Sequence, residues 1–116
     1  MQIDIQTRNF ALTDAIRSHS RRRLRFALSS YSDRIQRVVM RLSDINGPRG
    51  GADKCCHLQL VLPGLSDVVV EDIEADLYLA IDRAADRAGR TLGRRLARQR
   101  DRARSSGRPP AMSVAD

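Results

Sequence analysis

The sequence predicts an α+β domain with the element order β-α-β-β-β-α, a four-stranded sheet with two helices packed on one face. The chain has 116 residues, which is enough for one hydrophobic core and too few for two. Four short segments have the apolar patterns of strands, and two longer segments have the periodicity of amphipathic helices. Each helix has a single apolar stripe, so both must cover the same face of the sheet.

The first half of the chain predicts a strand, a helix and a second strand. Residues 2–7 alternate between apolar and polar side chains, as a half-buried strand does. Thr13 is a favourable N-cap and Asp14 suits the first turn, so we expect a helix over about 14–29. Residues 35–42 alternate again and predict the second strand. One side of the predicted helix collects Leu12, Ile16, His19, Ala27 and Tyr31.

The second half predicts two strands and a long helix. A Gly-rich loop over 44–54 precedes a third strand over about 55–62, and a fourth strand follows over 67–75. Asp76 is positioned to cap a helix over about 77–104. We expect one domain over 1–104 and a disordered tail over 105–116, which is rich in Gly, Pro and Ser. The apolar stripe of the second helix is Leu77, Ile81, Ala84, Ala88 and Leu92.

Two rows of arginines are the most informative feature of the chain. In the second helix, spacings of four, three, four and four place five arginines on one face, roughly opposite the apolar stripe: Arg83, Arg87, Arg90, Arg94 and Arg98. In the first helix, Arg17, Arg21 and Arg25 have a spacing of four. A row of like charges repels itself, so it indicates a polyanionic partner such as nucleic acid. We expect both rows to project from the helical layer, with a basic groove between them.

The composition agrees with a nucleic-acid partner. The formal net charge is +7, and Lys54 is the only lysine among 21 basic residues. Aromatic residues are scarce, which disfavours modules that stack single-stranded bases on an aromatic platform. No segment approaches the roughly 18 apolar residues of a membrane span, and the N-terminus does not resemble a signal peptide. We therefore expect a cytoplasmic protein with no membrane partner.

Cys55, Cys56 and His57 are the candidates for chemistry. Adjacent residues of a strand point to opposite faces, so we expect two free thiols. His19 is the only other histidine, and no second Cys or His pair supplies the spacing of a zinc site. Cys55 and His57 share a strand face, but no acidic orienting group follows from the sequence. We predict no enzyme activity, catalytic residue, metal, cofactor or small-molecule substrate.

Acidic residues gather between 67 and 86, before the arginines take over. This polarity partly complements the dipole of the second helix. It also leaves open an alternative function, a regulatory protein-interaction module whose acidic edge docks a basic partner: Glu71, Asp72, Glu74 and Asp76. Asp86 and Arg90 have the spacing of an ion pair within the helix. Arg23 would point toward the apolar side of its helix, so either its stem extends to the edge or the helix shifts register.

The chain resembles the ribosome hibernation-promoting factors, also called ribosome-associated inhibitors or sigma-54 modulation proteins. The matching segments are 1–5 (MQIDI), 12–17 (LTDAIR), 31–35 (YSDRI) and, most specifically, 76–82 (DLYLAID) before an Arg-rich helix. The first helix is one residue longer than in familiar members, and the loop over 44–54 is longer and richer in Gly. We expect no C-terminal dimerisation domain after the second helix, so in this respect the chain resembles the short form.

The resemblance implies a domain similar to double-stranded RNA-binding domains. It also implies binding of rRNA of the small ribosomal subunit in the mRNA and tRNA channel. Such a protein acts by occupancy and stabilises inactive ribosomes, and it needs no obligate oligomer. The RNA-binding positions implied here are Arg17, Arg21, Arg22 and Arg25 in the first helix and Arg83, Arg87, Arg90, Arg94 and Arg98 in the second.

Overall fold

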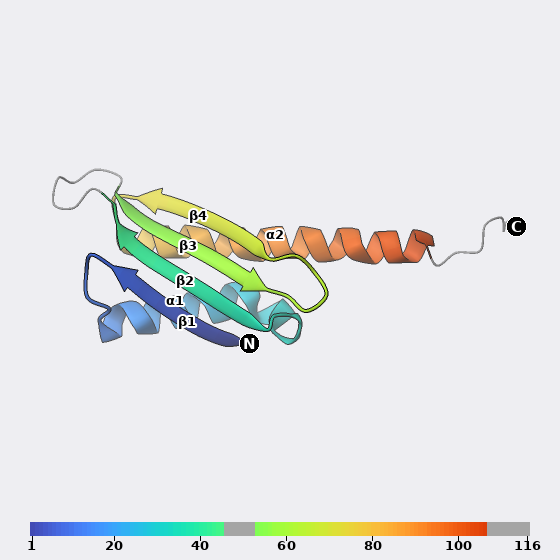
Figure 1. Ribbon diagram of the computed structural model, residues 1–116, viewed down its shortest axis with the longest axis horizontal. Helices are drawn as coiled ribbons and strands as arrows, with labels where there is room; N and C mark the ends of the chain where they lie inside the picture. Colours follow the sequence, from blue (N-terminus) through green and yellow to red (C-terminus); the bar gives the residue numbers. More distant parts are fainter. Residues whose placement is uncertain (46–52, 107–116) are drawn as a thin grey trace, which may run out of the picture.

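A sheet forms one layer of the molecule and both helices form the other (Figure 1). The computed structural model describes residues 1–45 and 53–106, with side chains up to residue 103. The predicted order β-α-β-β-β-α is confirmed, as is the packing of both helices on one face. The elements are β1 (Gln2–Arg8), α1 (Asp14–Leu28), the 3-10 helix η1 (Ser29–Arg34), β2 (Arg37–Asp44), β3 (Lys54–Val61), β4 (Val68–Glu74) and α2 (Leu77–Ser106).

The strands lie in the sheet in their sequence order, β1-β2-β3-β4. The connection from β1 to β2 passes through α1, and these two strands are parallel, as expected when a helix crosses over between them. The pairs β2–β3 and β3–β4 are antiparallel. The register aligns Met40 with Leu58 and Leu58 with Val70, so these side chains form one row under the helices.

The core lies between the sheet and the two helices. Every apolar residue predicted for α2 contributes to it: Ile81, Ala84, Ala88 and Leu92 are fully buried, and Leu77 packs at the edge. In α1, Ile16 is buried as predicted, and Leu12, Ala27 and Tyr31 pack against the core. His19 is half-buried, and the buried face is completed by Ser20, Leu24 and Leu28.

The helix starts agree with the predicted caps. Thr13 Oγ1 accepts a hydrogen bond from the Ile16 amide at 3.2 Å, and Asp76 Oδ1 accepts one from the Tyr78 amide at 3.0 Å. The chain continues from α1 into η1, so β2 begins two residues later than the predicted residue 35. Residues 46–52 of the predicted loop and 107–116 of the predicted tail lie outside the described residues.

The two helices cross at a glycine. A Cβ atom added to Gly89 of α2 would lie 2.7 Å from the backbone oxygen of Ala27 in α1. Only a residue without a side chain permits this separation. One turn further, a Cβ on Gly93 would lie 2.6 Å from the Tyr31 hydroxyl.

None of the described helices is apolar enough over sufficient length to cross a bilayer.

Candidate nucleic-acid interface

The arginine row of α2 is exposed along its whole length, as its spacing predicted. Opposite it, the apolar stripe is buried, so the outward face of the helix carries fixed positive charge. All five members of the row are exposed: Arg83, Arg87, Arg90, Arg94 and Arg98.

The row has two parts with different surroundings. Arg87 donates to Asp72 Oδ1 at 3.2 Å and to the Glu71 carbonyl at 2.6 Å, and Arg83 Nη1 lies 3.5 Å from Glu74 Oε2. These contacts tie the first two arginines to strand β4. Three other guanidinium groups have no hydrogen bond or ion pair within the described part of the chain: Arg90, Arg94 and Arg98. This second part of the row is free to meet a ligand.

The arginine row of α1 points away from α2. Arg23 contacts Asp86 of α2, and Arg21 and Arg25 lie two positions before and after it. At about 100° per residue, each is rotated by roughly 200° from Arg23, onto the opposite side of the helix. Arg17 and Arg25 are exposed and Arg21 is half-buried, and none of these three guanidinium groups has a partner among the described residues.

Paired charges, and not a basic groove, fill the space between the helices, so that prediction was wrong. Arg23 Nη2 lies 2.7 Å from Asp86 Oδ1, and Arg23 Nε lies 3.1 Å from Asp82 Oδ1. His19 Nε2 also contacts Asp82 Oδ1 at 2.7 Å, and Arg22 Nη2 lies 3.3 Å from His19 Nδ1. We call this cluster of paired charges the seam: His19, Arg22, Arg23, Asp82 and Asp86. The two basic rows lie on either side of it on the helical layer.

The seam also explains the anomalous position of Arg23. Helix α1 is continuous over Asp14–Leu28, so Arg23 reaches the edge of the core and extends to α2 without a register shift. Asp86 pairs with Arg23 across the helices, although its spacing from Arg90 would also allow a pair within α2.

Arg95 also joins α2 to the sheet, a role that the sequence analysis did not assign to it. Its Nη1 donates to the carbonyl oxygens of Ser66 at 2.7 Å and Asp67 at 3.0 Å, just before β4. Arg95 follows Arg94 by about 100° on the helix, which turns it from the outward row toward β4. The sequence shows that Arg95 lies next to the arginine row, but it does not show the carbonyl partners, which are distant along the chain.

The acidic edge proposed as an alternative docking surface is largely occupied within the molecule. Asp72 pairs with Arg87, Glu74 pairs with Arg83, and Asp76 caps α2. A shared hydrogen bond with Asp72, followed by burial, raises the pKa of the Glu74 carboxyl above its ordinary value. The structure therefore gives little support to docking of a basic partner through these carboxylates.

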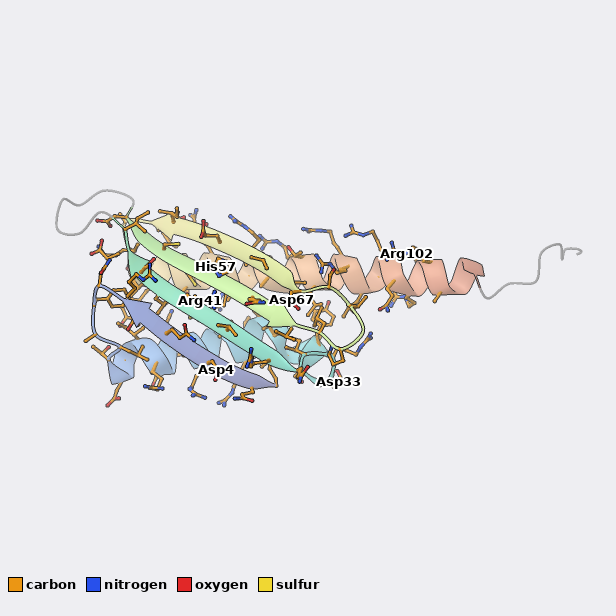
Figure 2. All side chains as sticks on the ribbon, in the orientation of Figure 1. Asp4, Asp33, Arg41, His57, Asp67 and Arg102 are labelled. Atoms are coloured by element: carbon orange, nitrogen blue, oxygen red, sulfur yellow. The ribbon has the colours of Figure 1, made fainter. Side chains whose placement is uncertain are left out.

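The sheet face that the helices leave uncovered carries a mixed polar row. Gln6, Arg41, His57 and Glu71 are aligned across the four strands, beside a solvent-open hollow of about 570 Å³. Figure 2 shows Arg41 and His57 on this face. The hollow brings Arg41, His57 and Glu71 together, but it combines both signs of charge.

The adjacent cysteines are both free and buried, as predicted. Cys56 lies in the core and Cys55 lies on the other face, beside His57 and Glu71. Burial, reinforced by Glu71, raises the pKa of the Cys55 thiol, which keeps it protonated. A nucleophilic cysteine needs the opposite shift. The described residues contain no group of three or more His, Cys, Asp or Glu that would hold a metal ion.

Comparisons with known proteins agree with this architecture. The family model described as Sigma 54 modulation protein / S30EA ribosomal protein matches residues 3–100. The crystal structure of the Thermus thermophilus Protein Y N-terminal domain is 36% identical, with a TM-score of 0.67, over 81% of this chain and 98% of that chain. A ribosomal subunit interface protein from Coxiella burnetii shares the fold at 20% identity, with a TM-score of 0.72, over 84% of this chain and 99% of that one. A search of curated proteins finds no match.

Proposed function

The chain belongs to the sigma 54 modulation protein / S30EA ribosomal protein family, and we propose that it binds rRNA of the small ribosomal subunit and stabilises inactive ribosomes. Family membership supports a ribosome-associated role in hibernation. The proposed site is the mRNA and tRNA channel, where a bound domain would exclude both ligands. Inhibition by occupancy requires no catalytic step and no cofactor.

The observation that carries the proposal is the exposed, unpaired part of the α2 row. Arg90, Arg94 and Arg98 have no anionic partner in the described structure, so a phosphate displaces only water from them. Arginine presents a planar fork of N–H donors that matches phosphate oxygens. Between Arg90 and Arg98 the helix advances by about 12 Å, so the three side chains present an elongated positive face.

The other arginines proposed to bind RNA differ in their contacts within the protein. Arg17, Arg21, Arg22 and Arg25 extend the positive surface along α1. Arg83 and Arg87 are oriented by β4, and a guanidinium has five N–H donors, so each retains donors for phosphate. We assign these two a secondary share of RNA binding, since their charge is partly neutralised already.

The test is co-sedimentation with small subunits, large subunits and whole ribosomes over a series of salt concentrations. The double variant Arg90→Glu/Arg94→Glu should lose saturable binding to the small subunit. The matched control is Arg37→Glu/Arg41→Glu, which makes the same change in net charge on the uncovered sheet face, where both arginines are exposed. The control should bind as the unmodified protein does.

Three results would contradict the proposal. Equal losses in the two variants would indicate that net charge alone governs binding. Binding to all RNA alike would indicate a general basic RNA-binding protein. Absence of binding to small subunits, large subunits and whole ribosomes, together with binding to a protein in nuclease-treated lysate, would favour the protein-interaction alternative.

A further inference from the structure

Phe26 of α1 is an exposed aromatic residue within the basic helical layer. Its side chain is 72% exposed, more than any other large apolar residue that the structure describes as exposed. Single exposed apolar residues are common on protein surfaces, so exposure alone does not indicate a binding site. The surroundings of Phe26 are what distinguish it.

Arginines surround the ring within α1. Arg22 and Arg23 precede Phe26 by four and three positions, so they share its side of the helix, and Arg25 is its neighbour in the chain. The Arg23 guanidinium carbon lies 5.6 Å from the centre of the Phe26 ring, a cation–π separation. Arg23 is itself held by Asp86 at 2.7 Å. The ring therefore has one anchored cationic neighbour and leaves most of its surface open.

Phe26 also lies next to a close contact between the two helices. The next residue, Ala27, is the one whose backbone oxygen approaches Gly89 of α2. Gly89 directly precedes Arg90, the first unpaired member of the α2 row. The helix crossing thus brings the segment that carries Phe26 beside the start of the free arginines.

We propose that Phe26 stacks on an unpaired base of the RNA that binds across the helical layer. This inference rests on the proposed function and adds a feature of the ligand, an unstacked nucleotide flanked by phosphates. Every base has a π-face that an aromatic ring accepts, and bases become available in loops and bulges. The nearby carboxylates, Asp82 and Asp86, are already paired with His19 and Arg23. Arg22 and Arg25 have no carboxylate partner among the described residues, so they leave positive charge beside the ring. That charge favours RNA over a protein surface as the occupant.

The experiment compares affinity for the small subunit among Phe26→Ala, Phe26→Leu and Phe26→Trp. Loss of one base stack should weaken binding by about 5- to 150-fold, the equivalent of about 1–3 kcal/mol. Leucine keeps an apolar side chain without a π-face, so Phe26→Leu should lose nearly as much as Phe26→Ala. Phe26→Trp should bind at least as tightly as the unmodified protein. Val69→Ala is the matched control, because Val69 is 55% exposed on the uncovered sheet face and should not affect affinity.

The outcomes separate this inference from the proposed function. If Phe26→Ala binds normally while Arg90→Glu/Arg94→Glu does not, stacking is overturned and the rRNA proposal stands. If Phe26→Leu binds normally and Phe26→Ala does not, the contact is aliphatic, as at a protein surface, and stacking is again overturned. If the arginine double variant binds normally, both proposals fail.

Discussion

Arg87 of α2 and Asp72 of β4 form an ion pair, with 3.2 Å between Arg87 Nη2 and Asp72 Oδ1, that fastens the long helix to the edge of the sheet. The carboxylate is only 8% exposed, whereas the guanidinium is 47% exposed. A buried carboxylate without a partner is costly, so this arginine has a structural task besides any contact with RNA.

Replacing Arg87 should therefore destabilise the fold. Breaking a fully buried pair costs about 3–5 kcal/mol, and the exposure of Arg87 lowers our expectation for Arg87→Met to about 1–2 kcal/mol. Urea denaturation measures the free energy of unfolding. Arg90→Met is the control, expected within about 0.5 kcal/mol of the unmodified protein. Equal stability of the two variants would show that the Arg87–Asp72 pair does not contribute to the free energy of unfolding.

The salt dependence of ribosome binding should report the number of phosphate contacts. With about five to eight contacts, a plot of log K against log salt should have a slope of roughly −4 to −7. Arg94→Gln should reduce its magnitude by about 1, and Arg87→Gln by less, because Asp72 already neutralises part of its charge. A slope near −1 for the unmodified protein would rule out the arginine rows as the main binding surface.

The helix crossing should tolerate no side chain at Gly89. Gly89→Ala places a methyl group against the Ala27 backbone, and we expect a loss of about 1–3 kcal/mol in the free energy of unfolding. That loss outweighs the roughly 1 kcal/mol that alanine gains over glycine in a helix. Gly93→Ala meets only the end of the Tyr31 side chain, which is able to move, so its change should stay below about 1 kcal/mol. Thermal or urea denaturation of the pair tests this, and similar costs would refute the distinction between backbone and side-chain obstruction.

The two thiols should be unreactive in the folded protein. Burial raises the pKa of both Cys55 and Cys56, so the reactive thiolate form is scarce for each. Ellman's reagent at pH 8 should modify them slowly in the native state and rapidly in guanidinium, where both become accessible. Native Cys55 reacting at the rate of a free cysteine would instead indicate an activated thiol beside His57.

Glu74 should make stability fall as the pH rises. Because Asp72 raises the pKa of Glu74 above 4.5 in the folded state, protonated Glu74 favours folding. That contribution is complete below the unfolded-state pKa and is lost as the pH rises through the folded-state pKa. Glu74→Gln keeps a donor toward Asp72 at every pH, so its stability relative to the unmodified protein should increase from pH 4 to pH 7. The same difference at both pH values, measured by urea denaturation, would contradict the assignment.

Local sequence patterns predicted the two α-helices and the four strands, but not η1 or the ion pairs between the helices. Thr13 and Asp76 act within one helical turn, so their capping roles followed from neighbouring residues. The exposure of the α2 arginines followed likewise from helical periodicity. Arg23 and Asp86 are 63 positions apart, and only the docking of α1 on α2 brings them together. The sequence therefore showed the possible partner Arg90 and not the actual partner Arg23, and for the same reason it predicted a basic groove where the charges are paired.

The hydrogen bonds from α2 to the backbone of β4 and of the two residues before it have a consequence for the protein when no ligand is bound. Strand β4 forms an edge of the sheet, and free carbonyl groups at such an edge invite a strand from another molecule. Arg87 occupies the carbonyl of Glu71, and Arg95 occupies those of Ser66 and Asp67. A positively charged side chain on each site also repels a second copy of this basic protein. The same helix thereby leaves fewer free backbone acceptors along this edge for a strand of another molecule.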